Sequence, residues 1–191
     1  MSAILVSFAV IFVAEMGDKS QLMALTFATR YRAVPILIGI TIATASVHGV
    51  SVLVGAVLAV SLPTDVINIV AGLAFLGFAA WTLRGDTLTD DEAAKVERQS
   101  NRSAIASASG AFFLAELGDK TMLATITLAS TDNPWWVWLG STVGMVAADA
   151  LAILVGRLLG ARLPERAITI FATVMFVLFG LALLLEGVGV L

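Results

Sequence analysis

The chain has 191 residues, of which 59% are hydrophobic and 13% are charged, and its mean hydropathy is +0.99. This hydropathy lies far above that of a soluble globular domain, so we expect an integral membrane protein. The absence of cysteine excludes disulfides, thiolate metal ligands and cysteine nucleophiles. The formal charge is −3 and the basic residues are scattered, so nucleic acid is not an expected partner.

Six apolar segments are long enough to cross a bilayer, which requires about 20 residues in a helix. In chain order we predict membrane-spanning helices over residues 2–29, 34–60, 66–84, 103–130, 135–158 and 166–189. The polar segment 85–102 separates the third helix from the fourth and reads as a solvated linker. We therefore expect an all-α membrane protein, with three helices in residues 1–84 and three in residues 103–191, forming one transmembrane domain.

Basic residues are distributed unequally between the two ends of these helices. Nine of the eleven Lys and Arg residues lie in or beside the first, third and fifth loops: Arg30, Arg32, Arg84, Lys95, Arg98, Arg102, Arg157, Arg162 and Arg166. The other two, Lys19 and Lys120, belong to the acidic motifs described below. The positive-inside rule places those loops in the cytoplasm. Both termini are then expected outside.

One acidic hexapeptide occurs twice, in the first and fourth predicted helices. The copies run from Glu15 to Ser20 (EMGDKS) and from Glu116 to Thr121 (ELGDKT), 101 residues apart. An ionisable residue at mid-membrane depth costs roughly 2.5 to 3.5 kcal/mol even on the most lenient insertion scale, so it indicates an ion pathway by default. The two copies therefore predict one composite cation site.

The same shift of 101 residues aligns more than the motifs. It places Gly39 on Gly140, Gly55 on Gly156 and Leu62 on Leu163, which indicates an internal repeat of three helices. Because three is an odd number, the second half enters the membrane from the opposite side. The sequence thus predicts two inverted three-helix repeats, an architecture that many secondary transporters share.

The two acids of each motif are three residues apart and would share one face of a continuous helix. Pseudo-symmetry would bring both pairs together, with hydroxyl oxygens nearby, and oxygen ligands suit Mg²⁺, Ca²⁺ and Mn²⁺. Gly17 and Gly118 lie between the acids and permit either close helix packing or local unwinding. The predicted ligands are Glu15, Asp18, Glu116 and Asp119, with the hydroxyls of Ser20 and Thr121.

Four further polar residues have roles that the sequence leaves open. Lys19 and Lys120 either neutralise neighbouring carboxylates or compete with the metal ion for them. His48 and Asp149 are also 101 residues apart, and each lies near the middle of a predicted helix. His48 is either a hydrogen-bonded packing residue or a group that couples protons or binds the ion. Asp149 either has such a role or forms a salt bridge to one of the lysines.

The charge count favours exchange of metal for protons. Five buried acids and two lysines leave a net charge of −3, which one divalent ion reduces to −1. Clustered carboxylates in a low-dielectric interior take up protons when the metal leaves. Antiport is therefore the mechanism that we expect from electrostatics.

The twin motifs closely resemble the signature of the GDT family of divalent cation/proton antiporters, two copies of E-φ-G-D-[KR]-[ST] in a three-plus-three arrangement. Glu15 to Ser20 and Glu116 to Thr121 match it at every position. The resemblance implies export of Mn²⁺, with Ca²⁺ as a further substrate, in exchange for protons. It implies the motif acids as the ion site and the bacterial inner membrane as the location. No cofactor is expected, because the metal is the substrate.

Two other functions are less well supported by the sequence than antiport. A passive divalent cation channel would use the same acids without proton coupling. An intramembrane enzyme is disfavoured, because the chain has no H-E-x-x-H pair and only one histidine. The expected partners are a divalent ion, protons and the lipid bilayer; the sequence leaves the oligomeric state open, a homodimer included.

Overall fold

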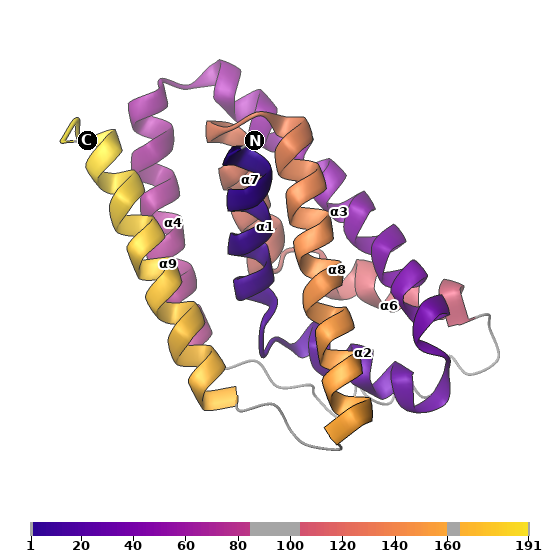
Figure 1. The fold of residues 1–191 in the computed structure, drawn as a ribbon. Helices are drawn as coiled ribbons and strands as arrows, with labels where there is room; N and C mark the ends of the chain where they lie inside the picture. Colours follow the sequence, from indigo (N-terminus) through magenta and orange to yellow (C-terminus); the bar gives the residue numbers. More distant parts are fainter. Residues whose placement is uncertain (1, 85–103, 160–164, 191) are drawn as a thin grey trace.

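The computed structural model describes residues 2–84, 104–159 and 165–190. In these ranges every regular element is a helix and there is no strand, which confirms the all-α class (Figure 1). The predicted linker 85–102 lies outside the described residues. The division into segments 1–84 and 103–191 therefore stays a prediction.

Among the described residues, four helices are long and apolar enough to cross a membrane. They are α3 (Ala33–Ser61), α4 (Thr64–Arg84), α8 (Pro134–Leu159) and α9 (Glu165–Gly187). They agree with the second, third, fifth and sixth predicted helices. The apolar composition of these helices supports an integral membrane protein.

The first and fourth predicted helices are each broken at the acidic motif. The first consists of α1 (Ser2–Glu15) and α2 (Lys19–Arg30), and the fourth of α6 (Ala104–Glu116) and α7 (Lys120–Thr131). The predicted helices over 2–29 and 103–130 are therefore each two shorter helices, with a break where the sequence left local unwinding open. Each break leaves helix ends inside the protein, where the terminal backbone groups lie outside the regular hydrogen-bond pattern of the helix.

The long helices α3 and α8 each pack on the broken helix of the other half of the chain. Helix α3 contacts α6 and α7, whereas α8 contacts α1 and α2. Helices α4 and α9 pack against each other at one side of the bundle (Figure 1). There Phe75 of α4 lies 6.0 Å from Phe176 and 5.3 Å from Phe179 of α9, measured between ring centroids.

Glycines at matching positions make the close contacts of α3 and α8. A Cβ added at Gly39 of α3 would lie 2.6 Å from Cβ of Ala108 in α6. A Cβ added at Gly140 of α8 would collide with Oγ of Ser7 in α1. Gly39 and Gly140, like Ser7 and Ala108, are 101 positions apart. The two halves therefore contact each other through equivalent positions.

The broken helices run in opposite directions through the bundle. Figure 1 shows the start of α1 and the end of α9 at one end, together with the α3–α4 and α7–α8 connections. From that end α1 and α2 lead to the opposite end, and α6 and α7 lead back. The breaks at the acidic motifs consequently lie between the two ends of the bundle.

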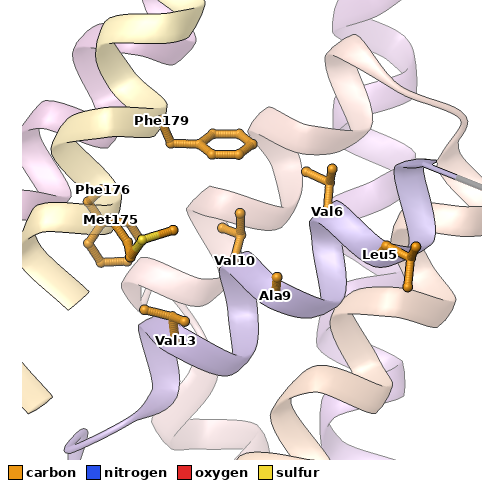
Figure 2. A pocket seen from close by; sticks show the side chains of 8 residues that line it. All are labelled: Leu5, Val6, Ala9, Val10, Val13, Met175, Phe176 and Phe179. Carbon is orange, nitrogen blue, oxygen red and sulfur yellow. The ribbon is translucent and has the colours of Figure 1, made fainter. Parts of the chain in front are cut away.

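A cavity of about 230 Å³ lies between α1 and α9 (Figure 2). Its lining is apolar and consists of Leu5, Val6, Ala9, Val10, Val13, Met175, Phe176 and Phe179. Such a lining offers no side-chain oxygen to a divalent cation. This cavity is therefore not a candidate cation site.

Candidate cation site

Both helix breaks have the same local conformation. The preceding helix ends at Glu15 or Glu116, and the second residue of each break is a glycine with positive φ, 78° at Gly17 and 80° at Gly118. A residue with a side chain rarely adopts this left-handed conformation. Of the two roles that the sequence left open for these glycines, local unwinding is therefore the one that the structure supports.

The motif aspartates lie at the starts of the second half-helices. Asp18 and Asp119 occupy the N-cap positions of α2 and α7, with φ, ψ of −80°, 165° and −78°, 168°. They do not share a helical face with Glu15 and Glu116, as a continuous helix would require, because the chain turns between the two acids. A helix N-terminus carries partial positive charge, which stabilises a carboxylate there.

The motif hydroxyls donate hydrogen bonds to the motif glutamates of the same copy. Ser20 donates to Glu15 Oε1, and Thr121 donates to Glu116 Oε2 over 2.8 Å. The other carboxyl oxygens, Oε2 of Glu15 and Oε1 of Glu116, have no hydrogen-bond partner among the described residues. All four side chains are buried. Each glutamate thus keeps one oxygen for a ligand.

One ion pair joins the two motifs. Nζ of Lys120 lies 2.6 Å from Oδ1 of Asp18, and both side chains are buried. Lys120 belongs to the second motif and Asp18 to the first, so the contact crosses between the halves. The two motifs therefore contact each other at this ion pair.

The motif acids and Asp149 form one electrostatically connected group. The carboxyl group of Glu15 interacts electrostatically with those of Glu116, Asp18, Asp149 and Asp119. In the described part of the chain, however, no three His, Asp or Glu side chains converge as the ligands of a metal ion do. The group therefore has the oxygen donors for a divalent cation, but its carboxylates stand apart with a lysine among them.

Neither His48 nor Asp149 has a hydrogen-bond partner among the described residues. Both side chains are fully buried, on α3 and α8 respectively. The salt bridge from Asp149 to a lysine, one of the two alternatives that the sequence left open, is not found among the described residues, and Lys120 pairs with Asp18. A hydrogen-bonded packing role for His48 is likewise not found. Such unsatisfied buried groups are costly, and they concentrate at functional sites.

Gln21 has a role that the sequence did not reveal. Its Oε1 accepts a hydrogen bond from the backbone N–H of Gly17 over 2.8 Å, and its Nε2 donates to the carbonyl of Ala148 over 3.0 Å. It thus ties the first break to α8, beside Asp149. The second motif has Met122 at this position, whose sulfur lies 3.2 Å from the backbone nitrogen of Gly118. The only sequence signal for this role is the position of Gln21, a polar residue directly after the motif within an apolar segment.

Comparison with known families identifies one family that matches both halves of the chain. The family profile described as "Divalent cation/proton antiporter GDT1" matches residues 3–90 and 104–190, which include both breaks. The chain belongs to the GDT1 family. This is a family of cation transporters in membranes, and GDT1 membership confirms the resemblance seen in the twin motifs.

Several GDT1 relatives match over nearly the whole chain. A Vibrio cholerae protein named "Putative manganese exporter" is 36% identical over 185 residues, covering 95% of this chain and 90% of its own length. A GDT1-like protein of Synechocystis is 29% identical and covers 94% of this chain and 95% of its own length. A chloroplastic GDT1-like protein of rice is 30% identical over 92% of this chain and 59% of its own length. No solved structure matches at a significant level.

Proposed function

We propose that this GDT1 protein exports Mn²⁺, with Ca²⁺ as a second substrate, from the cytoplasm in exchange for protons. The observation that carries the proposal is the pair of matching helix breaks, which bring buried acids from both halves of the chain into one group. Broken helices with ions bound at the break are a recurring feature of secondary transporters. The name of the Vibrio cholerae relative supports manganese as the substrate.

The architecture that we propose is two inverted repeats of three spans, α1 to α4 and α6 to α9. The opposite directions of the two broken helices support it (Figure 1). So does a contact between equivalent residues, in which Thr44 Oγ1 of α3 donates to Sδ of Met145 in α8 over 3.3 Å. These two residues are 101 positions apart. Contact between equivalent residues is expected where a pseudo-two-fold axis passes through a molecule.

In this proposal the ion binds between the two breaks. Its ligands are the carboxylates of Glu15, Asp18, Glu116 and Asp119, which must move closer together than they lie in the structure. Ser20 and Thr121 now donate to the glutamates. Each hydroxyl oxygen also has lone pairs, so it can rotate toward a bound cation and complete an oxygen site. Carboxylates of both halves then bind the same ion.

Protons would replace the metal on the same acids. When the divalent ion leaves, a buried group of carboxylates cannot keep all its charges in a low-dielectric interior. Asp149 and His48, buried and without hydrogen-bond partners, are further groups that can hold protons. We assign proton coupling to these two residues. In the orientation that we propose, the loops that carry the basic residues lie in the cytoplasm and both termini lie outside.

Reconstitution into proteoliposomes tests the proposal. We expect an imposed pH gradient to drive Mn²⁺ transport by the wild-type protein, and we expect Asp119→Asn to abolish it, because the substitution removes one charge from the ion site. Asp65→Asn is the matched control, since Asp65 is an exposed aspartate in the first turn of α4. It should transport as the wild type does.

Two results would contradict the proposal at different points. Mn²⁺ flux that ignores the pH gradient would identify a passive channel. Full activity of Asp119→Asn would place the ion site elsewhere. Competition by Ca²⁺ in the same assay reports whether both ions share the site.

A further inference from the structure

The buried acid group already contains a cation that belongs to the protein. The ammonium of Lys120 lies 2.6 Å from Asp18 Oδ1, and the relative accessibilities of the two side chains are 4% and 0%. A charge-assisted hydrogen bond of this length is a strong interaction, particularly away from water. The ammonium therefore stands where one of the proposed ligands would meet a metal ion.

The equivalent lysine of the first motif is placed differently. Lys19 is half-buried, and within the described ranges no carboxylate lies at ion-pair distance from it. Lys19 and Lys120 occupy the same position of the hexapeptide, 101 residues apart. The local sequence cannot explain the difference, so it must arise from how the two halves pack.

Charge balance gives the buried ion pair a consequence for metal binding. A lone buried carboxylate is unfavourable, and a buried pair is retained only when each partner compensates the other. A divalent ion that binds Asp18 must therefore break the contact with Lys120. The released ammonium is then repelled by the bound metal, so ion and lysine are mutually exclusive at this carboxylate.

We propose that Lys120 is a tethered counter-cation, which occupies the Asp18 carboxylate while the site holds no metal and must be displaced for metal to bind. The proposal rests on the function assigned above and specifies how the same site is regulated. Lys120 lowers the affinity for the metal ion and favours its release by taking its place. Lys19 has no such role, so the two halves of the site are unequal despite matching sequences.

Equilibrium Mn²⁺ binding to the purified full chain, measured by electron paramagnetic resonance or calorimetry, tests this proposal. We expect Lys120→Gln to bind Mn²⁺ roughly 5- to 150-fold more tightly than the wild type, which is the range of coupling free energies typical of two linked binding events in proteins. Lys19→Gln, the matched control, should change the affinity much less. In transport, Lys120→Gln should show a lower KM together with a lower kcat, because release slows.

A second variant keeps the proposal testable if Lys120→Gln does not fold. In Lys120→Arg the guanidinium can hold a carboxylate through two hydrogen bonds, so we expect weaker Mn²⁺ binding than in the wild type. A purely structural role predicts unchanged affinity for Lys120→Arg and no gain for Lys120→Gln, and either result would overturn the proposal. Absence of Mn²⁺ binding by the wild type would instead refute the proposed function itself.

Discussion

Replacing Gly118 with alanine tests whether the break in the second motif depends on a left-handed residue. Gly118 has a φ of +80°, and a Cβ added there would meet no atom within 4 Å. The substitution therefore adds no collision, and its cost comes from backbone conformation alone. A left-handed conformation costs an L-residue roughly 1–2 kcal/mol. We expect Gly118→Ala to lower the free energy of unfolding by about that amount.

Gly110 provides the matched control for this experiment. It lies inside α6, and a Cβ added there also meets nothing within 4 Å. Because alanine is favoured over glycine in a helix interior, Gly110→Ala should stabilise the protein by roughly 0.5–1 kcal/mol. Each of the two substitutions adds one methyl group, at Gly110 inside α6 and at Gly118 just after it. The predicted difference between them is therefore about 1.5–3 kcal/mol.

Unfolding in mixed detergent micelles, followed by circular dichroism or tryptophan fluorescence, measures both variants. Gly118→Asn should fall between Gly118→Ala and the wild type, because asparagine tolerates the left-handed region better than alanine does. A Gly118→Ala protein as stable as Gly110→Ala would refute the reasoning. It would mean that the break is not held in the left-handed conformation.

Two further predictions concern the packing of α8 on the first broken helix. Gln21→Met, which copies the second motif, should lower both thermal stability and the Mn²⁺ transport rate, because it removes the amide that accepts a hydrogen bond from Gly17 N–H and donates one to the Ala148 carbonyl. Wild-type rates would show that this link to α8 is dispensable. Gly144→Ala should be destabilising in the same unfolding assay, since its Cβ would lie 2.6 Å from the carbonyl oxygen of Phe8, whereas Gly77→Ala, with no atom within 4 Å, should not be. Equal stabilities would contradict the close contact of α1 with α8.

The sequence predicted much of the fold because its strongest signals are local. Apolar length and the charged or proline-containing turns located the long helices to within a few residues. The shift of 101 residues identified glycines such as Gly39 and Gly140 as equivalent, and both make close helix contacts. Burial of the motif acids also followed from their position within apolar segments.

The helix breaks and the unequal lysines could not be predicted in the same way. The residues around Gly17 are compatible with a continuous helix, and the break is stabilised partly by Gln21, which reaches α8 more than a hundred positions away. Likewise Lys19 and Lys120 have nearly the same neighbours in sequence. Only the tertiary arrangement decides that Lys120 pairs with Asp18. Such long-range contacts leave no periodic signal in the chain.

Proton movement driven by a Mn²⁺ gradient tests the central claim most directly, because it requires the ion site and the coupling together. Proteoliposomes loaded with a pH-sensitive dye and no pH gradient are exposed to external Mn²⁺, with the wild type compared with Glu116→Gln. We predict that Mn²⁺ entering through the wild type drives protons out and raises the internal pH, and that Glu116→Gln abolishes the change. Mn²⁺ entry through the wild type without any proton movement would contradict the account.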